Sequence, residues 1–107
     1  MMIYEQIRLR PKNIEIIKMA FKESFLPGDR LWVFGSRVNL AARGGDIDLY
    51  VETEESDLGK VFDMRGNFWV KLQDMLGEQK IDIVVHAKNN EILRIHKVAL
   101  ATGIQII

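Results

Sequence analysis

The chain of 107 residues carries 15 basic and 15 acidic residues, no cysteine and 48% apolar residues, which is typical of one folded domain. This composition excludes a disulfide framework and thiolate metal sites, and it argues against a broad nucleic-acid surface, which usually needs a basic excess. No apolar run approaches the roughly 20 residues of a membrane span. The N-terminal residues lack the apolar segment of a signal peptide, so we expect a cytoplasmic protein.

The first half of the chain predicts a helix followed by two strands. Residues 11–26 place apolar residues at helical spacing, with Pro11 in the first turn. Residues 30–35 form a continuous apolar run, typical of a strand buried on both faces. Residues 36–43 have room for one or two helical turns before a Gly-Gly break. Residues 46–52 alternate, which predicts a strand; one face holds Ile47, Leu49 and Val51, and the other holds Asp46, Asp48, Tyr50 and Glu52.

The second half predicts two more helices and two more strands. Residues 57–76 read as a helix capped by Gly77, with an irregular early part because Gly59 and Gly66 weaken it. Residues 79–86 predict a strand, residues 89–102 a helix, and residues 103–107 a short final strand. The expected apolar positions of the two helices are Leu58, Val61, Phe62, Phe68 or Trp69, Leu72 and Leu76, and then Ile92, Leu93, Ile95, Val98 and Ala99. This order predicts an α+β fold, a small mixed β-sheet backed by helices.

Two carboxylates stand two positions apart in the second strand. Asp46 and Asp48 share one face and lie about 6–7 Å apart along the chain. Two like charges at ~4 Å repel by about 1 kcal/mol in water, so a solvated amphipathic strand explains the pair if that face is wet. The Asp-x-Asp motif is short and common, and alone it favours that simpler interpretation.

Asp82 makes the metal-site interpretation stronger. It sits inside the apolar run "IDIVV", where an isolated carboxylate needs a partner or an ion. If the third strand lies beside the second, Asp82 meets Asp46 and Asp48. Three carboxylates on one patch require a cation, and Mg²⁺ is the hard ion that prefers oxygen ligands. Two such ions about 3.5–4 Å apart would form a two-metal phosphoryl-transfer site.

A Gly-Ser turn follows the first strand. Gly35 lets the backbone approach a ligand closely, and the N–H groups after it, with the Ser36 hydroxyl, are suited to an anion. Arg37 is within reach of the same phosphate, although a surface role is the simpler interpretation for Arg37 and for Arg43. Phosphate donors and metal ligands together indicate a nucleoside triphosphate site. For His86, His96 and Tyr50 we predict no chemical role.

This constellation resembles the nucleotidyltransferases of the DNA polymerase β superfamily. Their pattern is an apolar strand, Gly-Ser, about ten residues, Asp-x-Asp in the next strand and a third carboxylate in a later one. Here it reads Phe34-Gly35-Ser36, nine intervening residues, Asp46-Ile47-Asp48, and then Asp82. The Arg after Gly-Ser, the "ARGG" segment and the "DIDLYVE" strand look most like the minimal nucleotidyltransferases (MNT). We therefore expect a single minimal nucleotidyltransferase domain over residues 1–107, with the DNA polymerase beta-like fold.

The resemblance implies a role for each matching residue. Gly35 and Ser36, with Arg37, would grip the triphosphate, while Asp46 and Asp48 would hold the Mg²⁺ ions. Asp82 would complete the metal site and act as a base. The implied reaction moves a nucleotidyl group, AMP from ATP, to an acceptor hydroxyl.

Minimal members typically pair with a HEPN-domain ribonuclease toxin encoded by a neighbouring gene, to which they act as antitoxin, so the resemblance implies a protein acceptor. One alternative is a non-catalytic nucleotide-binding module that neutralises its partner by direct binding. Transfer to tRNA or to an antibiotic is a third class, and the neutral charge argues against tRNA. The sequence leaves the oligomeric state open, whether homo- or hetero-oligomer.

Overall fold

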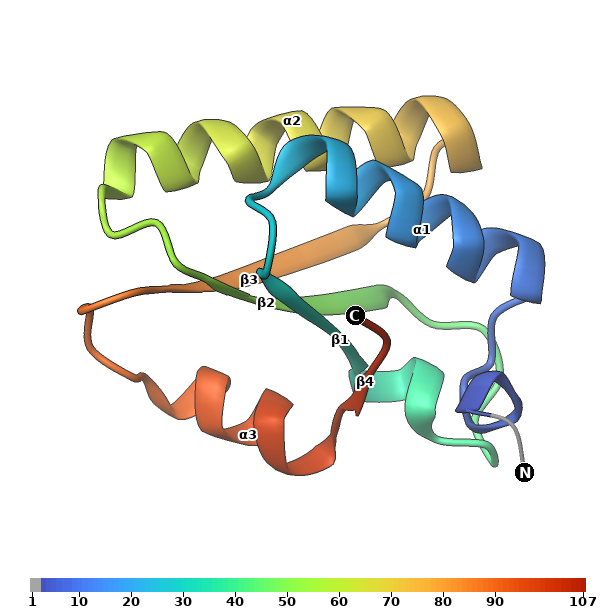
Figure 1. Ribbon diagram of the computed structural model, residues 1–107. Coiled ribbons are helices and arrows are strands. Elements are labelled where there is room, and N and C mark those ends of the chain that lie inside the picture. Colours follow the sequence, from blue (N-terminus) through green and yellow to red (C-terminus); the bar gives the residue numbers. More distant parts are fainter. Residues whose placement is uncertain (1–2) are drawn as a thin grey trace.

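The computed structural model describes residues 3–107, which form a four-stranded sheet between two layers of helix (Figure 1). The elements in chain order are η1 (Ile3–Gln6), α1 (Pro11–Ser24), β1 (Arg30–Phe34), η2 (Gly35–Val38), β2 (Ile47–Thr53), α2 (Leu58–Leu76), β3 (Ile81–Ala87), α3 (Arg94–Thr102) and β4 (Ile104–Gln105). The strand order is β3-β2-β1-β4. The predicted α+β class, with a small mixed sheet backed by helices, is confirmed.

The sheet is mixed because β1 and β2 are antiparallel, whereas β2 and β3 are parallel. In this register Phe34, at the end of β1, lies opposite Asp48, and Asp48 lies opposite Asp82 of β3. β4 adds a short antiparallel pairing to the other side of β1. The register therefore brings the end of β1 and the acidic starts of β2 and β3 together at the same end of the sheet.

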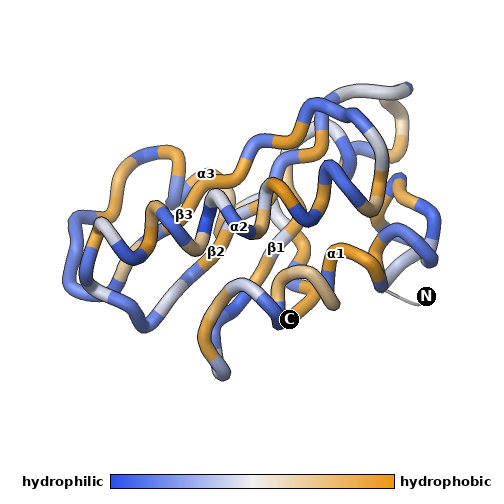
Figure 2. Tube along the Cα trace, turned by 90° about the horizontal axis from the view of Figure 1, so that it is seen from above, coloured by the Kyte–Doolittle hydropathy of each residue, from blue (hydrophilic) through white to orange (hydrophobic). Residues whose placement is uncertain are grey.

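The helices α1 and α2 lie side by side over one face of the sheet and enclose the main core (Figure 2). Side chains at alternate strand positions, including Leu31, Leu49 and Ile83, point into this core. Between the helices and the sheet, the Phe21 ring lies 5.0 Å from the ring of Phe25 and 5.7 Å from that of Phe68. Burial of these apolar side chains is the main source of the fold's stability.

The opposite face of the sheet is covered in part by α3. Trp32, Phe34 and Tyr50 form a second buried cluster with Ala99 of α3. β1 is therefore buried on both faces, as its continuous apolar run predicted. A solvated amphipathic strand does not account for the whole polar face of β2, because Tyr50 is fully buried beneath α3. The two ends of this face, at Asp48 and at Glu52, are left partly open.

Two helix predictions need correction. α2 is continuous through Gly59 and Gly66, and Asp57 caps its start by accepting hydrogen bonds from the N–H groups of Gly59 and Lys60. In this helix the predicted core residues Leu58 and Phe62 are exposed, and Trp69 is only half covered.

The predicted helix over 89–102 begins instead at Arg94, and it contributes His96 and Ala99 to the buried interior. The apolar positions Ile92, Leu93, Ile95 and Val98 are exposed. The physical reason is that α3 is only nine residues long and contacts the sheet along a narrow line. Among the helices of residues 3–107, none is long and apolar enough to cross a membrane.

Candidate active site

The site begins at Gly35, where β1 passes into the single 3₁₀ turn of η2. Gly35 has a φ of +73°, in the left-handed region that side chains disfavour. A Cβ atom at this position would lie 2.2 Å from Oδ2 of Asp48. The backbone of the turn is therefore in direct contact with the Asp48 carboxylate, and only glycine fits between them.

Ser36 and Gly45 fold the following loop back over this turn. The Ser36 hydroxyl donates a hydrogen bond to the Asp46 carbonyl at 3.3 Å. A Cβ atom on Gly45, whose φ is +92°, would lie 2.4 Å from Ser36 Oγ. The loop between η2 and β2 thus carries Asp46 close to the turn that holds Ser36.

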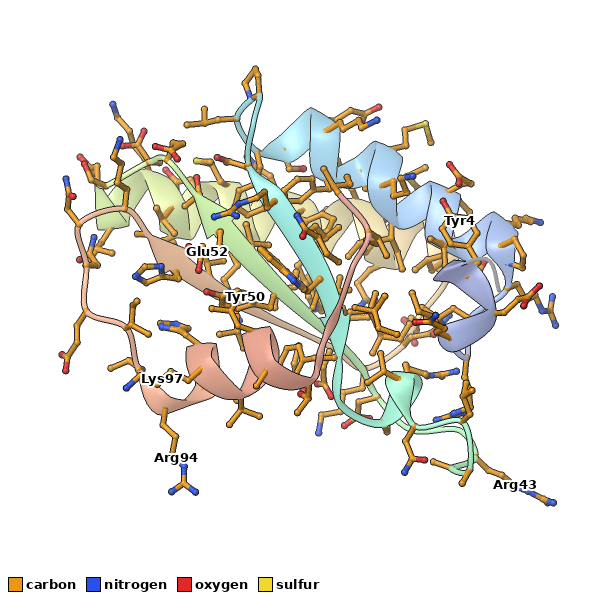
Figure 3. All side chains as sticks on the ribbon, turned by 60° about the horizontal axis from the view of Figure 1, so that its bottom comes forward. Tyr4, Arg43, Tyr50, Glu52, Arg94 and Lys97 are labelled. Atoms are coloured by element: carbon orange, nitrogen blue, oxygen red, sulfur yellow. The ribbon has the colours of Figure 1, made fainter. Side chains whose placement is uncertain are left out.

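Two arginines hold this loop in place through backbone carbonyls. Arg37 donates to the carbonyls of Arg8 and Gly45, each at 3.0 Å. Arg8 donates in turn to the carbonyls of Ser36, Asn39 and Gly44, each at 2.8 Å. Both terminal nitrogens of Arg37 are thus engaged by backbone carbonyls, one in the N-terminal segment and one in the loop. Arg43 points away into solvent (Figure 3).

Asp48 and Asp82 lie next to each other on the same face of the sheet. They are direct partners in the parallel register of β2 and β3, in which paired residues point to the same side. Burial first, and then the nearby charges of Asp82 and Asp46, raise the pKa of Asp48 above its ordinary value. The expected adjacency of the second and third strands is therefore found, and it concentrates negative charge at Asp48.

Asp46 lies beside this pair, but its side chain is turned toward a lysine. It precedes β2 by one residue, and its Oδ2 lies 3.3 Å from Nζ of Lys80, just before β3. Within residues 3–107 no three His, Asp or Glu side chains are arranged as a ready metal cluster. The structure thus brings two of the three predicted carboxylates together and places the third next to them, paired with Lys80.

The chemistry of the donor set fits a divalent cation. The groups at the site are carboxylate oxygens, the preferred ligands of a hard ion such as Mg²⁺. Burial first, and then repulsion from Asp82 and Asp46, raise the pKa of Asp48, so its ionised form is disfavoured without a cation. A bound cation would offset this repulsion, and Asp46 would join the site by leaving the exposed Lys80 pair.

The far end of the same sheet face holds a separate polar group. Tyr50 donates a hydrogen bond to Glu52, and the two residues lie side by side on β2 facing α3 (Figure 3). Glu52 also contacts Nδ1 of His86 at 2.8 Å. His96 accepts a hydrogen bond from the Leu93 N–H at 3.0 Å and is buried, so it is a satisfied interior histidine. These groups link the strands to α3.

Sequence reasoning missed two residues that shape the site. Arg8 carried no signal, because the carbonyls it holds are 28 to 36 positions away in the chain. Lys80 carried a weak sequence signal, since it immediately precedes the apolar run that contains Asp82. In both cases the contact depends on the packed fold.

A comparison with protein-family models matches residues 14–107 to the family described as polymerase beta, nucleotidyltransferase. The match spans most of the chain, so the protein belongs to this nucleotidyltransferase family, and the resemblance seen in the motifs is confirmed at the level of the family. The protein is accordingly a transferase with the polymerase beta-like fold. No curated protein matches the chain significantly.

Proposed function

We propose that the protein is a Mg²⁺-dependent nucleotidyltransferase that moves AMP from ATP to a hydroxyl group of a partner protein. The observation that supports this proposal best is the parallel register that sets Asp82 beside Asp48, with Gly35 in contact with the same carboxylate. Carboxylates next to a glycine turn suit a triphosphate that carries its own cations. Family membership supplies the reaction class.

Each residue then has a chemical task. The N–H groups after Gly35, with the Ser36 hydroxyl, would hold the phosphate chain, and Asp46, Asp48 and Asp82 would hold the cations. The bound cations would stabilise the negative charge that develops on the phosphate oxygens. Asp82 is the most exposed of the three carboxylates and would accept the proton of the incoming hydroxyl. The hydroxyl oxygen bonds to the α-phosphorus as the bond to the bridging oxygen breaks, and pyrophosphate leaves.

The acceptor we favour is a protein. The balanced charge of 15 basic and 15 acidic residues gives little attraction for a nucleic-acid backbone. By resemblance to the minimal nucleotidyltransferases, the partner is a HEPN-domain ribonuclease toxin encoded by a neighbouring gene. The protein would then act as the antitoxin by modifying a toxin hydroxyl.

The test mixes the purified protein with Mg²⁺, α-labelled ATP and the product of the neighbouring gene. We expect label on the partner and none when Mg²⁺ is chelated. Asp48→Asn keeps the side-chain shape but removes the charge, and should lower transfer by at least about 100-fold. Glu54→Gln is the matched control, because Glu54 is an exposed carboxylate at the other end of β2.

Two outcomes would contradict the proposal. If Asp48→Asn transfers label as fast as the unmodified chain, the carboxylate pair is not the active site. If no label moves but both proteins bind and the partner is neutralised equally well by Asp48→Asn, the protein is the non-catalytic binding module.

A further inference from the structure

β3 forms one edge of the sheet, and its outer side presents backbone groups that are not paired with another strand of residues 3–107. Among residues 3–107 it pairs with β2 alone, on one side. The Ile83 carbonyl accepts a hydrogen bond from Arg65 Nε of α2 at 2.7 Å, so the peptide groups of Ile83 and Val85 face the open side. The strand, Ile81–Ala87, contains no proline and no lysine, the residues that commonly prevent edge pairing.

The flank of α2 next to this edge is apolar and exposed. The opposite flank faces α1, where Lys71 pairs with Glu23 at 3.3 Å. Leu58, Phe62, Arg65 and Trp69 follow at intervals of three or four residues and so lie along one stripe. Because Arg65 reaches β3, this stripe runs beside the open edge. Its apolar members Leu58, Phe62 and Trp69 are 62%, 71% and 44% exposed.

We propose that this edge patch, which consists of the open side of β3 and the stripe Leu58, Phe62 and Trp69, is an interface between two copies of the chain. The two β3 strands pair antiparallel about a two-fold axis, so the two four-stranded sheets join into one. A patch of this kind must be complementary to itself, because both copies present the same surface. The register of β3 and the spacing along α2 both meet this requirement.

Pairing centred on Val84 uses the whole strand. Ile81 then lies opposite the partner subunit's Ala87, and Ile83 lies opposite the partner subunit's Val85. The same register places Asp82 opposite the partner subunit's His86, so no like charges face each other. Arg65 releases the Ile83 carbonyl, which the partner strand then bonds.

The same axis fits α2. The Arg65 contact to Ile83 sets the middle of α2 over the middle of β3. The point midway between Arg65 and Gly66 is equally far from Phe62 and from Trp69. When the two helices cross antiparallel at this point, Phe62 faces the partner subunit's Trp69 and Trp69 faces the partner subunit's Phe62. Gly66 lies at this crossing with open space around it, which lets the two helices approach closely. This gives a reason for a glycine that otherwise weakens the helix by about 1 kcal/mol.

The area available sets the expected affinity. An aromatic side chain covers about 150–250 Å², so Phe62 and Trp69 together leave on the order of 200 Å² uncovered. A standard interface covers about 800 Å² on each partner, and the strand edge must supply much of the remainder. We therefore expect a weak, reversible dimer that forms at micromolar or higher protein concentration. The proposal goes beyond the nucleotidyltransferase activity and does not depend on it.

The test measures mass by sedimentation over about 1 to 300 μM protein, a range that covers the concentrations at which we expect the dimer to form. The average mass should rise from the monomer's 12.4 kDa toward twice that value. Hydrogen exchange at the Ile83 and Val85 amides should slow over the same range. The amides of Asp82 and Val84, which face β2, should not change, and they serve as the internal control.

Phe62→Glu should keep the protein monomeric throughout this range without affecting folding, because Phe62 is largely exposed. Val70→Glu is the matched control, since Val70 lies on the same helix, is 52% exposed and points about 100° away from Trp69. It should dimerise like the unmodified chain. A monomer at every concentration would overturn the proposal and leave the patch to a different protein. Dimers that survive Phe62→Glu, or that leave exchange at Ile83 and Val85 unchanged, would equally overturn it.

Discussion

Gly35 shows how much of the site depends on one missing side chain. Ala at this position would need a φ of +73° and a Cβ atom 2.2 Å from the Asp48 carboxylate. Gly28 has a similar φ of +88°, but a Cβ atom there would meet nothing within 4 Å. The two glycines therefore separate the backbone cost of a substitution from damage to the site.

We predict that Gly35→Ala and Gly28→Ala each lower the free energy of unfolding by about 1–2 kcal/mol through backbone strain. Only Gly35→Ala should also displace Asp48, and it should reduce nucleotidyl transfer by at least about 100-fold. Urea unfolding and the labelled-ATP assay measure the two effects. Equal activity in the two variants would contradict the contact between Gly35 and Asp48 as a requirement of the site.

At this scale the sequence was informative where the chemistry is local. The Gly-Ser turn and the Asp-x-Asp spacing are short patterns. Asp82 stood out as an isolated carboxylate in an apolar strand, but the premise that its face is shielded from solvent is wrong, because Asp82 is exposed. The pairing of Asp46 with Lys80 was not predictable, because it depends on how two loops meet. Arg37 stays a predicted phosphate ligand, although in the structure it donates to two carbonyls.

At the scale of elements, Asp29 joins α1 to β2. It is buried, and its carboxylate accepts hydrogen bonds from the N–H groups of Leu26 and Glu54, each at 2.9 Å, and from the Thr53 hydroxyl at 2.7 Å. The turn after α1 and the end of β2 are therefore held by one side chain. The "PGD" segment read only as a helix stop, since the partners near Thr53 are 24 residues away or more.

We predict that Asp29→Ala lowers the free energy of unfolding by about 3 kcal/mol, because it removes three bonds to a buried charge and leaves polar groups unpaired. Asp57→Ala is the matched control: Asp57 also accepts from two backbone N–H groups, but it is an exposed helix cap. It should cost only about 1 kcal/mol. Thermal or urea unfolding measures both, and equal losses would contradict the importance of burial.

The wrong core assignments in two helices share one cause. In α2 and α3, apolar residues occur at helical spacing on more than one side, so periodicity alone could not say which side meets the sheet. Phe62 and Ile95 were assigned to the core, yet both are exposed. The strands were placed better, because β1 and β2 are flanked by glycine-rich turns and their alternation allows only two faces.

At the scale of the whole molecule, one polar network ties β2 and β3 to α3. His86 of β3 contacts Glu52 of β2 at 2.8 Å and the Asn90 carbonyl at 2.9 Å. The rings of His86 and His96 of α3 lie 5.1 Å apart. Tyr50 completes the group through its bond to Glu52. The charge of His86 therefore affects how strands and helix hold together.

The two histidines respond to pH in opposite directions. Burial alone would lower the pKa of His86, but its hydrogen bonds to Glu52 and to the Asn90 carbonyl outweigh burial and raise the pKa above the ordinary value. Burial and the neighbouring His86 lower the pKa of His96. His86 thus stabilises the fold fully below about pH 6.5, and this contribution is lost as the pH rises through its folded pKa. The contribution of His96 is present above about pH 6.5 and is lost in acid.

We predict that His86→Gln lowers the free energy of unfolding by about 1.5–3 kcal/mol near pH 6, where the charged bond to Glu52 is lost. The difference from the unmodified protein should shrink toward pH 8.5, because His86 of the unmodified protein also loses its proton there, and with it most of the stabilisation from the charged bond to Glu52. Urea unfolding at several pH values between about 5.5 and 8.5 measures this, a range that lies above the ordinary pKa values of Asp and Glu. Lys88→Gln, which breaks the exposed pair with Glu54, is the control and should change stability equally at every pH. A loss for His86→Gln that stays constant or grows with pH would show that the network is held by neutral hydrogen bonds, not by a charged histidine.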